Sequence, residues 1–317
     1  MVNRGTNPYM ELNQRGVFFT TLAIVILILF LTGYTFHTTA SQRKTVQNRI
    51  ATMDNFLGAL EADLARNAYI VGFRTLVIFE QKTTESGAYI ANLNESVNEA
   101  FLNGTYNSES QSIMIGATFA DIRQAMQEKA KKMNINLTLS SANITLTQED
   151  PWKVTVTMST HLTMEDATAI ARWNKTLIVS SKIDIQNFND PLYTIKTQGK
   201  IMNKINKTMY EPFVTGSSIT NLSKHALNSS YTNTTDAPSF LDRLQGLTNP
   251  SAQGIESLVN VQKLSVQGIA VEEKTVVDHV YFSTQNPTSS SIQGMPSWFR
   301  LDEEHVDRYG ARLLSSF

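Results

Sequence analysis

The strongest pattern in the chain is one long apolar run near its N-terminus. Residues 17–36 carry no charged side chain, and Val, Ile, Leu and Phe dominate them. At a rise of about 1.5 Å per residue, this run predicts a helix roughly 30 Å long, which matches the hydrocarbon core of a bilayer. Each large apolar side chain favours insertion by roughly 0.3–0.6 kcal/mol. We therefore expect residues 17–36 to form a transmembrane helix.

A second pattern, with a helical repeat, follows the apolar run. Apolar residues recur at steps of three and four from Val46 to Val71, and charged residues occupy many of the opposite positions. No proline interrupts residues 17–80, so the transmembrane helix is expected to continue into an amphipathic stem over residues 37–80. The stripe suits packing on the chain's own head and equally packing on another subunit.

Beyond the stem, the repeat changes from helical to alternating. Apolar residues keep helical spacing over residues 116–133, and alternation begins directly afterwards. Asp150-Pro151 and Asp190-Pro191 would each form a turn that leads into a strand. The alternating runs predict an antiparallel sheet with one solvated face. They are residues 134–140, 144–146, 154–162, 177–185 and 193–201.

The last third of the chain is less regular. Residues 204–238 are rich in Asn, Ser and Thr, which predicts a surface loop or linker. Within residues 239–317, a strand is expected at 276–282 and a closing helix at about 302–314. This C-terminal part would either add to the sheet or form a small cap subdomain.

Together these patterns predict an α+β fold in which a long N-terminal helix packs on an antiparallel β-sheet head, in the shape of a lollipop. The expected segments are a leader (1–16), a transmembrane helix (17–36), an amphipathic stem (37–80), an α+β head (81–203), a polar loop (204–238) and a C-terminal part of the head or cap (239–317).

The composition excludes several classes of partner and of functional site. The formal net charge is −1, and the densest basic run is confined to residues 129–132, so we expect no nucleic-acid partner. The chain has no cysteine, which excludes disulfides, thiolate nucleophiles and cysteine-based zinc sites. The exported part must therefore be held by burial and hydrogen bonding.

The sequence offers no catalytic motif. It lacks a nucleophile elbow, phosphate-binding glycine loops and the zinc-binding His-Glu-x-x-His pattern, and its five histidines are scattered. The acidic run from Asp302 to Asp307, which includes His305, suits a helix N-terminus better than a metal site. His279 is expected on a strand, facing solvent or a loop, and the Trp298-Phe299 pair is interpreted as core. We expect no enzyme activity, no metal and no cofactor; an extracytoplasmic hydrolase with an unfamiliar site is a weaker alternative.

Nine Asn-x-Ser/Thr sequons mark candidate glycosylation sites, all of them beyond the apolar run. Two of them alternate with apolar strand positions and should lie on the solvated face of the sheet, namely Asn136 and Asn143. The full set is Asn94, Asn103, Asn136, Asn143, Asn174, Asn206, Asn221, Asn228 and Asn233.

The orientation follows from these sequons and from the leader. Basic residues flanking the run slightly favour the reverse topology, because Arg43, Lys44 and Arg49 follow it and only Arg4 and Arg15 precede it. A short leader with a basic residue beside the apolar run nevertheless fits an export signal. We expect a single-pass protein of the cell membrane, with its N-terminus inside and its head outside.

The junction between leader and helix carries a family resemblance. The leader ends Arg15-Gly16, and the helix opens Val17-Phe18-Phe19. This junction resembles the class III signal of type IV pilins, especially their archaeal relatives. The resemblance implies cleavage after Gly16 by a prepilin peptidase. Thr21 stands at the fifth mature position, where bacterial pilins usually have glutamate, so the archaeal branch is favoured.

Two other fates of the leader are weighed against this cleavage. One is an uncleaved signal anchor. The other is a conventional signal peptide cut after Ala40, although the apolar run exceeds the usual length of about 7–15 residues.

The expected function is that of an exported pilin-like structural or assembly subunit. The resemblance implies that the N-terminal helix packs with other pilin-like subunits after it leaves the membrane lipid. The large head favours a minor pilin or pseudopilin that acts in surface contact or filament assembly. The alternative is a permanently anchored extracellular receptor, adhesin or solute-binding protein that never polymerises.

Overall fold

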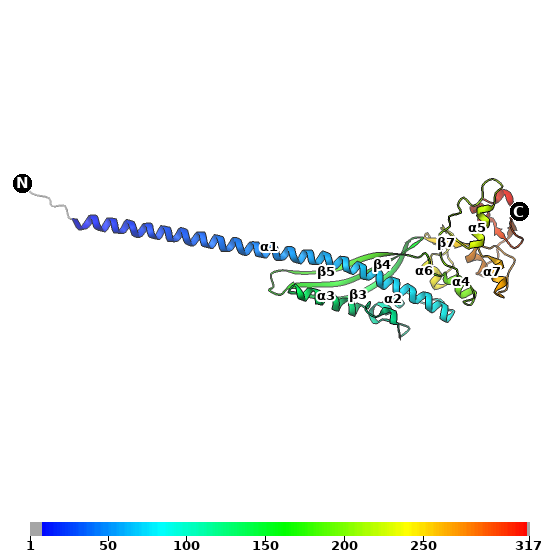
Figure 1. Ribbon diagram of the computed structural model, residues 1–317, viewed down its shortest axis with the longest axis horizontal. Coiled ribbons are helices and arrows are strands. Elements are labelled where there is room, and N and C mark those ends of the chain that lie inside the picture. The colour runs from blue at the N-terminus through cyan, green and yellow to red at the C-terminus, as the bar shows by residue number, and fades with distance from the viewer. Residues whose placement is uncertain (1–7, 316–317) are drawn as a thin grey trace, which may run out of the picture.

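One helix dominates the molecule. The computed structural model describes residues 8–315, and side chains from residue 16 onward; the first seven residues of the expected leader lie outside this range. Helix α1 (Pro8–Ser86) has 79 residues, which corresponds to about 120 Å at 1.5 Å per residue. Its first half extends beyond the rest of the fold, and its second half lies against it (Figure 1).

The projecting half of α1 is the apolar run. Its large side chains are exposed, from Val17 at 60% to Phe36 at 78%. By length and composition, this part of the helix is able to cross a membrane. Its threonine hydroxyls donate to carbonyls one turn back, as Thr21 does to Val17 O at 2.8 Å and Thr32 to Ile28 O at 2.9 Å. The threonine hydroxyls of the run are thereby satisfied within the helix, as an apolar surrounding requires.

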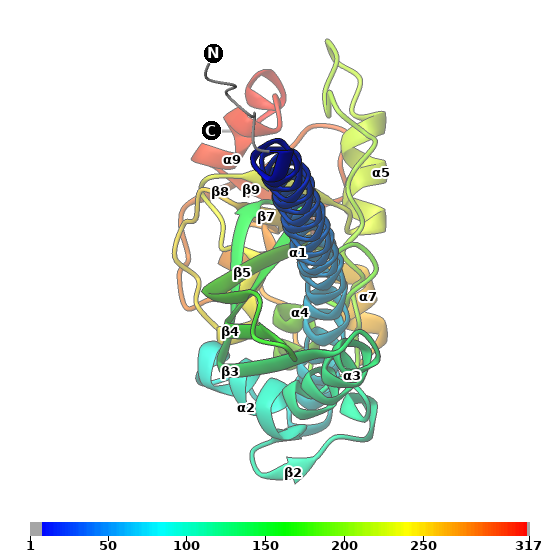
Figure 2. The same ribbon diagram turned by 90° about the vertical axis from the view of Figure 1, so that its left-hand side faces the viewer.

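The second half of α1 packs on a three-stranded antiparallel sheet. The strands are β3 (Ile135–Asp150), β4 (Lys153–Asp166) and β5 (Arg172–Asp184), in the order β3-β4-β5. Helix α1 lies against β4 and β5, while α2 (Leu93–Asn103) and α3 (Phe119–Lys132) lie against β3 (Figure 2). The buried residues of the stem are Met53, Leu57, Leu60, Leu64, Ala68, Val71, Thr75, Leu76, Ile78 and Phe79, together with Gly72. Within one chain, the amphipathic stripe therefore packs on its own head.

Two contacts fix where α1 meets the sheet. Arg49 ion-pairs with the carboxylate of Asp166 and donates to Met133 O at 2.7 Å, which ties the helix to the edge of the head. Hydrogen bonds from Thr168 and Arg49 lower the pKa of Asp166 to about 2. Farther along, Gly72 faces the Val156 side chain so closely that a Cβ there would clash with it.

The structure corrects the strand predictions at two places. The runs 134–140 and 144–146 belong to the single strand β3, whose register shifts between Ser140 and Asn143 so that both parts turn their apolar residues toward the helices. Residues 193–201 do not form a strand. Asp190 caps helix α4 (Pro191–Lys196) by accepting from Leu192 N at 2.8 Å, and Pro191 suits the first turn of a helix.

The C-terminal part has its own hydrophobic core at the end of the molecule away from the projecting helix (Figure 1). It holds two small antiparallel sheets, β6-β7 and β8-β9. Its elements are α5 (Thr220–Asn228), β6 (Tyr231–Thr234), α6 (Phe240–Gln245), β7 (Gly254–Ser257), α7 (Val261–Val266), α8 (Asp278–Tyr281), β8 (Ser289–Ser291), β9 (Arg300–Asp302) and α9 (Glu303–Arg308). Short elements also flank α3 and end the chain: β1 (Thr105–Tyr106), β2 (Glu109–Ser110), η1 (Ser112–Met114) and η2 (Arg312–Leu314).

Three further predictions were wrong here. Residues 204–238 are not simply a surface loop, because α5 and β6 lie within them and Leu222 and Tyr231 are fully buried. The segment 276–282 contributes one β-bridge at Val277 and then forms the single turn α8. The closing helix stops at Arg308, because Gly310 has a φ of +66°. Phe299 is fully buried, which confirms its place in the core.

Candidate functional site

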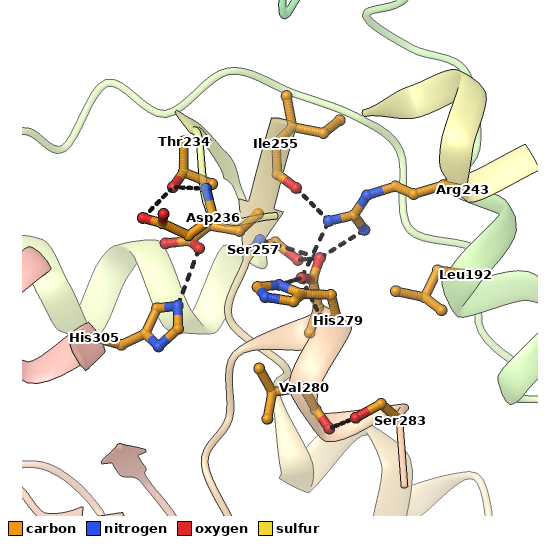
Figure 3. Close-up of polar contacts among 12 residues, drawn as sticks. Leu192, Thr234, Asp236, Arg243, Ile255, Ser257, His279, Val280, Ser283 and His305 are labelled. Atoms are coloured by element: carbon orange, nitrogen blue, oxygen red, sulfur yellow. Dashed lines mark hydrogen bonds and ion pairs between the residues drawn. The ribbon is translucent and has the colours of Figure 1, made fainter. Parts of the chain in front are cut away.

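The densest polar cluster lies in the C-terminal part and centres on Arg243 of α6. The Arg243 guanidinium is 0% exposed; its Nη1 lies 2.6 Å from Asp190 Oδ2 and 2.9 Å from Asp278 Oδ2. Its Nη2 donates to the carbonyl oxygen of Ile255 (Figure 3). One cation thus joins the start of α4, the start of α8 and strand β7.

The two carboxylates have further hydrogen-bond donors. Asp278 Oδ2 accepts from the Ser257 hydroxyl at 2.9 Å, and Asp190 Oδ2 accepts from the Tyr231 hydroxyl at 2.8 Å. Burial disfavours the charged form of Asp278, but the guanidinium of Arg243 and the hydrogen bond from His279 outweigh burial and hold its pKa well below the usual range. Asp278 is therefore the carboxylate ionised against Arg243, whereas burial and the nearby charge of Asp278 raise the pKa of Asp190 above its usual value.

A second buried cluster surrounds Glu256 of β7. The Glu256 carboxylate lies 2.7 Å from Arg308 Nε and 3.3 Å from His305 Nε2, and it accepts from the Tyr309 hydroxyl at 2.9 Å. His305 Nδ1 lies 2.6 Å from Asp302 Oδ1. Burial alone would lower the pKa of His305, but the hydrogen bond to Asp302 and the nearby Glu256 carboxylate raise it to about 10. His305 is thus a buried imidazolium at neutral pH.

These clusters are built to hold the C-terminal part together. The side chains of Asp190, Arg243, Glu256 and Asp278 are fully buried, so a substrate would have no access to them. Within residues 8–315, no three His, Asp or Glu side chains are arranged to hold a metal ion. Asp302 caps α9 by accepting from His305 N at 3.2 Å, which agrees with the helix-terminus interpretation of the acidic run.

His279 differs from its expected position. It is 7% exposed and follows the first residue of the short helix α8. Its ring lies 5.9 Å from the ring of His305, between the two clusters. The expectation of a solvent-facing strand residue was wrong, because Val276 and Val277 on its N-terminal side and Val280 on the other enter the core together.

A surface cleft of about 680 Å³ adjoins the Glu256 cluster. Glu211, Thr232 and Arg308 provide its polar walls, and Phe213 and Tyr309 provide its apolar walls. The guanidinium of Arg308 is already occupied by Glu256 and by the carbonyl of Asn233, and the Glu211 carboxylate accepts from the Thr232 hydroxyl at 2.6 Å. Its polar walls are thus largely paired with one another.

The expected processing residues lie far from these clusters. Arg15, Gly16 and Val17 belong to the continuous helix α1. Val17 is 60% exposed, and a Cβ at Gly16 would meet nothing within 4 Å. The junction lies on a free helix surface.

The sequon asparagines are distributed over the surface. Eight are exposed, and Asn221 is half-buried with its Nδ2 donating to Pro212 O at 3.0 Å. Asn136 on β3 and Asn174 on β5 both lie on the open face of the sheet, which no helix covers, as does Asn143 beyond the register shift. The exposed members are Asn94, Asn103, Asn136, Asn143, Asn174, Asn206, Asn228 and Asn233.

The sequence reasoning missed the Arg243 cluster. Arg243 lies between the apolar residues Leu241 and Leu244, and its two carboxylate partners are 53 and 35 residues away. Asp242, which directly precedes Arg243, is the nearer acidic residue but pairs with Ser239 in the capping box of α6, so no local signal identifies the two distant partners.

Comparison with protein-family models, with curated proteins and with solved structures finds no match to this chain.

Proposed function

We propose that this protein is an exported, membrane-anchored subunit of the pilin-like kind, which acts in filament assembly or surface contact. The supporting observation is the division of α1. One uninterrupted helix is apolar and exposed over its first half and buried on a head over its second half. Such a helix places the head at a fixed distance from whatever apolar surrounding receives residues 17–36.

The exposed half of the helix requires a partner of apolar character. A row of large side chains from Val17 to Phe36 is too extensive to remain in water. Membrane lipid satisfies this need in the precursor, and the corresponding helices of other subunits satisfy it in an assembly. Because lipid and a helical core are both apolar, assembly would be driven by packing and interhelical contacts. The bacterial-type glutamate is absent, which favours the archaeal branch of the family.

In this proposal the head lies outside the cell. The sequon asparagines would then face the compartment in which glycosylation occurs, and the N-terminus would stay inside until a prepilin peptidase acts after Gly16. The chain would work by contact and assembly, without catalysis and without a cofactor.

The mass of the mature N-terminus tests the proposal. Protein isolated from the membranes of its natural host should begin at Val17. Replacing Gly16 with a bulky residue should block the cut, whereas Gly33→Ala is the matched control because Gly33 also lies in the apolar helix with open space around it. A product that retains the leader would favour the permanently anchored receptor, adhesin or solute-binding protein.

Assembly can be tested by crosslinking, because the chain has no cysteine of its own. A cysteine introduced at Ala23, on the projecting helix, should form disulfide-linked subunits in isolated membranes or filaments. A cysteine at Thr176, on the open face of the sheet, is the control and should remain unlinked. If both variants remain monomeric, the polymerising function is contradicted.

A further inference from the structure

A second, smaller cleft lies near the end of the molecule opposite the projecting helix. It has a volume of about 400 Å³ and is lined by residues of α7 and of the segment that follows α4; Figure 1 shows α4 and α7 at that end of the molecule. Its walls include Lys200, Met202, Gln262, Lys263, Val266 and Gln267. This volume falls within the range of about 300–1,000 Å³ that is typical of small-molecule sites.

The cleft is positively charged, although the whole chain has a net charge of −1. No Asp or Glu lines it. Lys200 Nζ lies 3.4 Å from the carbonyl oxygen of Gln267, and among residues 8–315 neither Lys200 nor Lys263 has a carboxylate within 4 Å. The neighbouring segment 191–210 contains four lysines and no acidic residue. Both ammonium groups are therefore available to an anion.

The same cleft offers apolar and amide surface. Met202 is 54% exposed and Val266 is 82% exposed, although both are large apolar residues. The side chain of Gln262, whose carboxamide both donates and accepts hydrogen bonds, is exposed beside them. Ammonium, carboxamide and aliphatic groups thus line one small hollow.

We propose that this cleft binds an acidic saccharide, one whose sugar rings carry carboxylates. The carboxylates would pair with Lys200 and Lys263. The ring hydroxyls would bond to the carboxamide of Gln262, and the C–H face of a ring would lie on Met202 and Val266. The choice of an external saccharide over an anionic lipid rests on the proposed function, because the cleft then points away from the membrane that holds α1.

The test is direct binding of trigalacturonate to the full chain in neutral detergent micelles, measured by calorimetry. Binding should weaken when the salt concentration rises from about 50 to about 500 mM, since exposed charges are screened. The double change Lys200→Gln/Lys263→Gln should weaken binding at least fivefold. The matched control, Lys131→Gln/Lys132→Gln, removes the same charge from exposed positions on α3 and should leave the affinity unchanged. Val266→Ser should also weaken binding, because it removes apolar surface from the cleft without changing its charge. A site that recognised charge alone would not respond to this substitution.

Several results would overturn the inference. Among them are an absence of trigalacturonate binding, equal weakening by both lysine pairs, and equal affinity for neutral maltotriose. Preference for vesicles of anionic phospholipid over trigalacturonate would also contradict it. This assay does not depend on processing, so its outcome is separable from the mass of the mature N-terminus. A processed chain that fails to bind overturns only the saccharide site, and an unprocessed chain that binds overturns only the pilin-like role.

Discussion

Arg243 is the residue on which the C-terminal part depends most directly. Replacing it with Met would leave Asp190 and Asp278 buried without a countercharge, and we expect the free energy of unfolding to fall by about 3–5 kcal/mol. Urea denaturation measures this loss in the free energy of unfolding. Arg312→Met is the control, because Arg312 pairs with Asp307 at the surface, where ion pairs contribute little. Equal losses in both variants would show that the buried cluster has no special role.

Deprotonation of His305 should lower the stability of the protein as the pH becomes alkaline. The folded chain keeps the His305 proton up to a pKa of about 10, whereas the unfolded chain releases it near pH 6.5. Its contribution is complete below about pH 6.5 and is lost as the pH rises through about 10, with a slope of up to about 1.4 kcal/mol per pH unit.

The variant His305→Gln should flatten this dependence. Urea midpoints measured between pH 6.5 and 9.5 should converge for the native chain and the variant as the pH rises. His161→Gln, on the open face of the sheet, should keep the native slope. A native slope in the His305 variant would mean that other groups cause the alkaline loss.

The buried charges illustrate why such clusters escape sequence analysis. The residues next to Arg243 and Glu256 in the sequence do not indicate which side chains pair with them, because these contacts join residues dozens of positions apart. The cap at Asp302 was predictable, because the acidic residues and the helix they start are adjacent in sequence.

At the scale of elements, the close approach of α1 to β4 depends on Gly72. An added methyl group there would clash with Val156 and contact Ile183 at 3.0 Å. We expect Gly72→Ala to destabilise the head, because overpacking costs roughly 1–3 kcal/mol, which outweighs the gain in helix propensity.

Gly58 provides the matched control on the same helix. A Cβ at Gly58 would meet nothing within 4 Å, so Gly58→Ala should stabilise the protein by roughly 0.5–1 kcal/mol through helix propensity alone. Thermal melting of the two variants should give shifts of opposite sign. Shifts of the same sign would mean that α1 does not approach β4 as closely as described.

Most of the elements with many repeats were predicted, although the 11-residue helix α2 was missed, and the short elements were not predicted. The helices α1 and α3 and the strands β3 to β5 each extend over more than ten residues, which is enough to distinguish a repeat of 3.6 from one of 2. Helices α4 and α8 are only six and four residues long. Over so short a length, an apolar pattern fits a helix and a strand equally well, and tertiary packing decides which of the two forms.

At the scale of the whole molecule, the projecting helix and the head are energetically separate. The apolar run buries nothing within the chain, so its removal should not affect the stability of the head. The first contacts that matter are made by Arg49 and Met53. A chain of residues 40–317 should therefore be soluble and monomeric, and it should melt at the same temperature as the full chain in detergent.

A chain of residues 55–317 is the counterpart, because it lacks both Arg49 and Met53 while removing only fifteen more residues of the same helix. Asp166 would lose its cation, and the apolar surface that Met53 covers at the end of the sheet would be exposed. We expect a lower melting temperature and faster amide exchange near Met133 and Asp166. If the chain of residues 40–317 instead aggregates or unfolds, the apolar helix is required for folding itself, and the separation of anchor from head, on which its role as a removable spine depends, is lost.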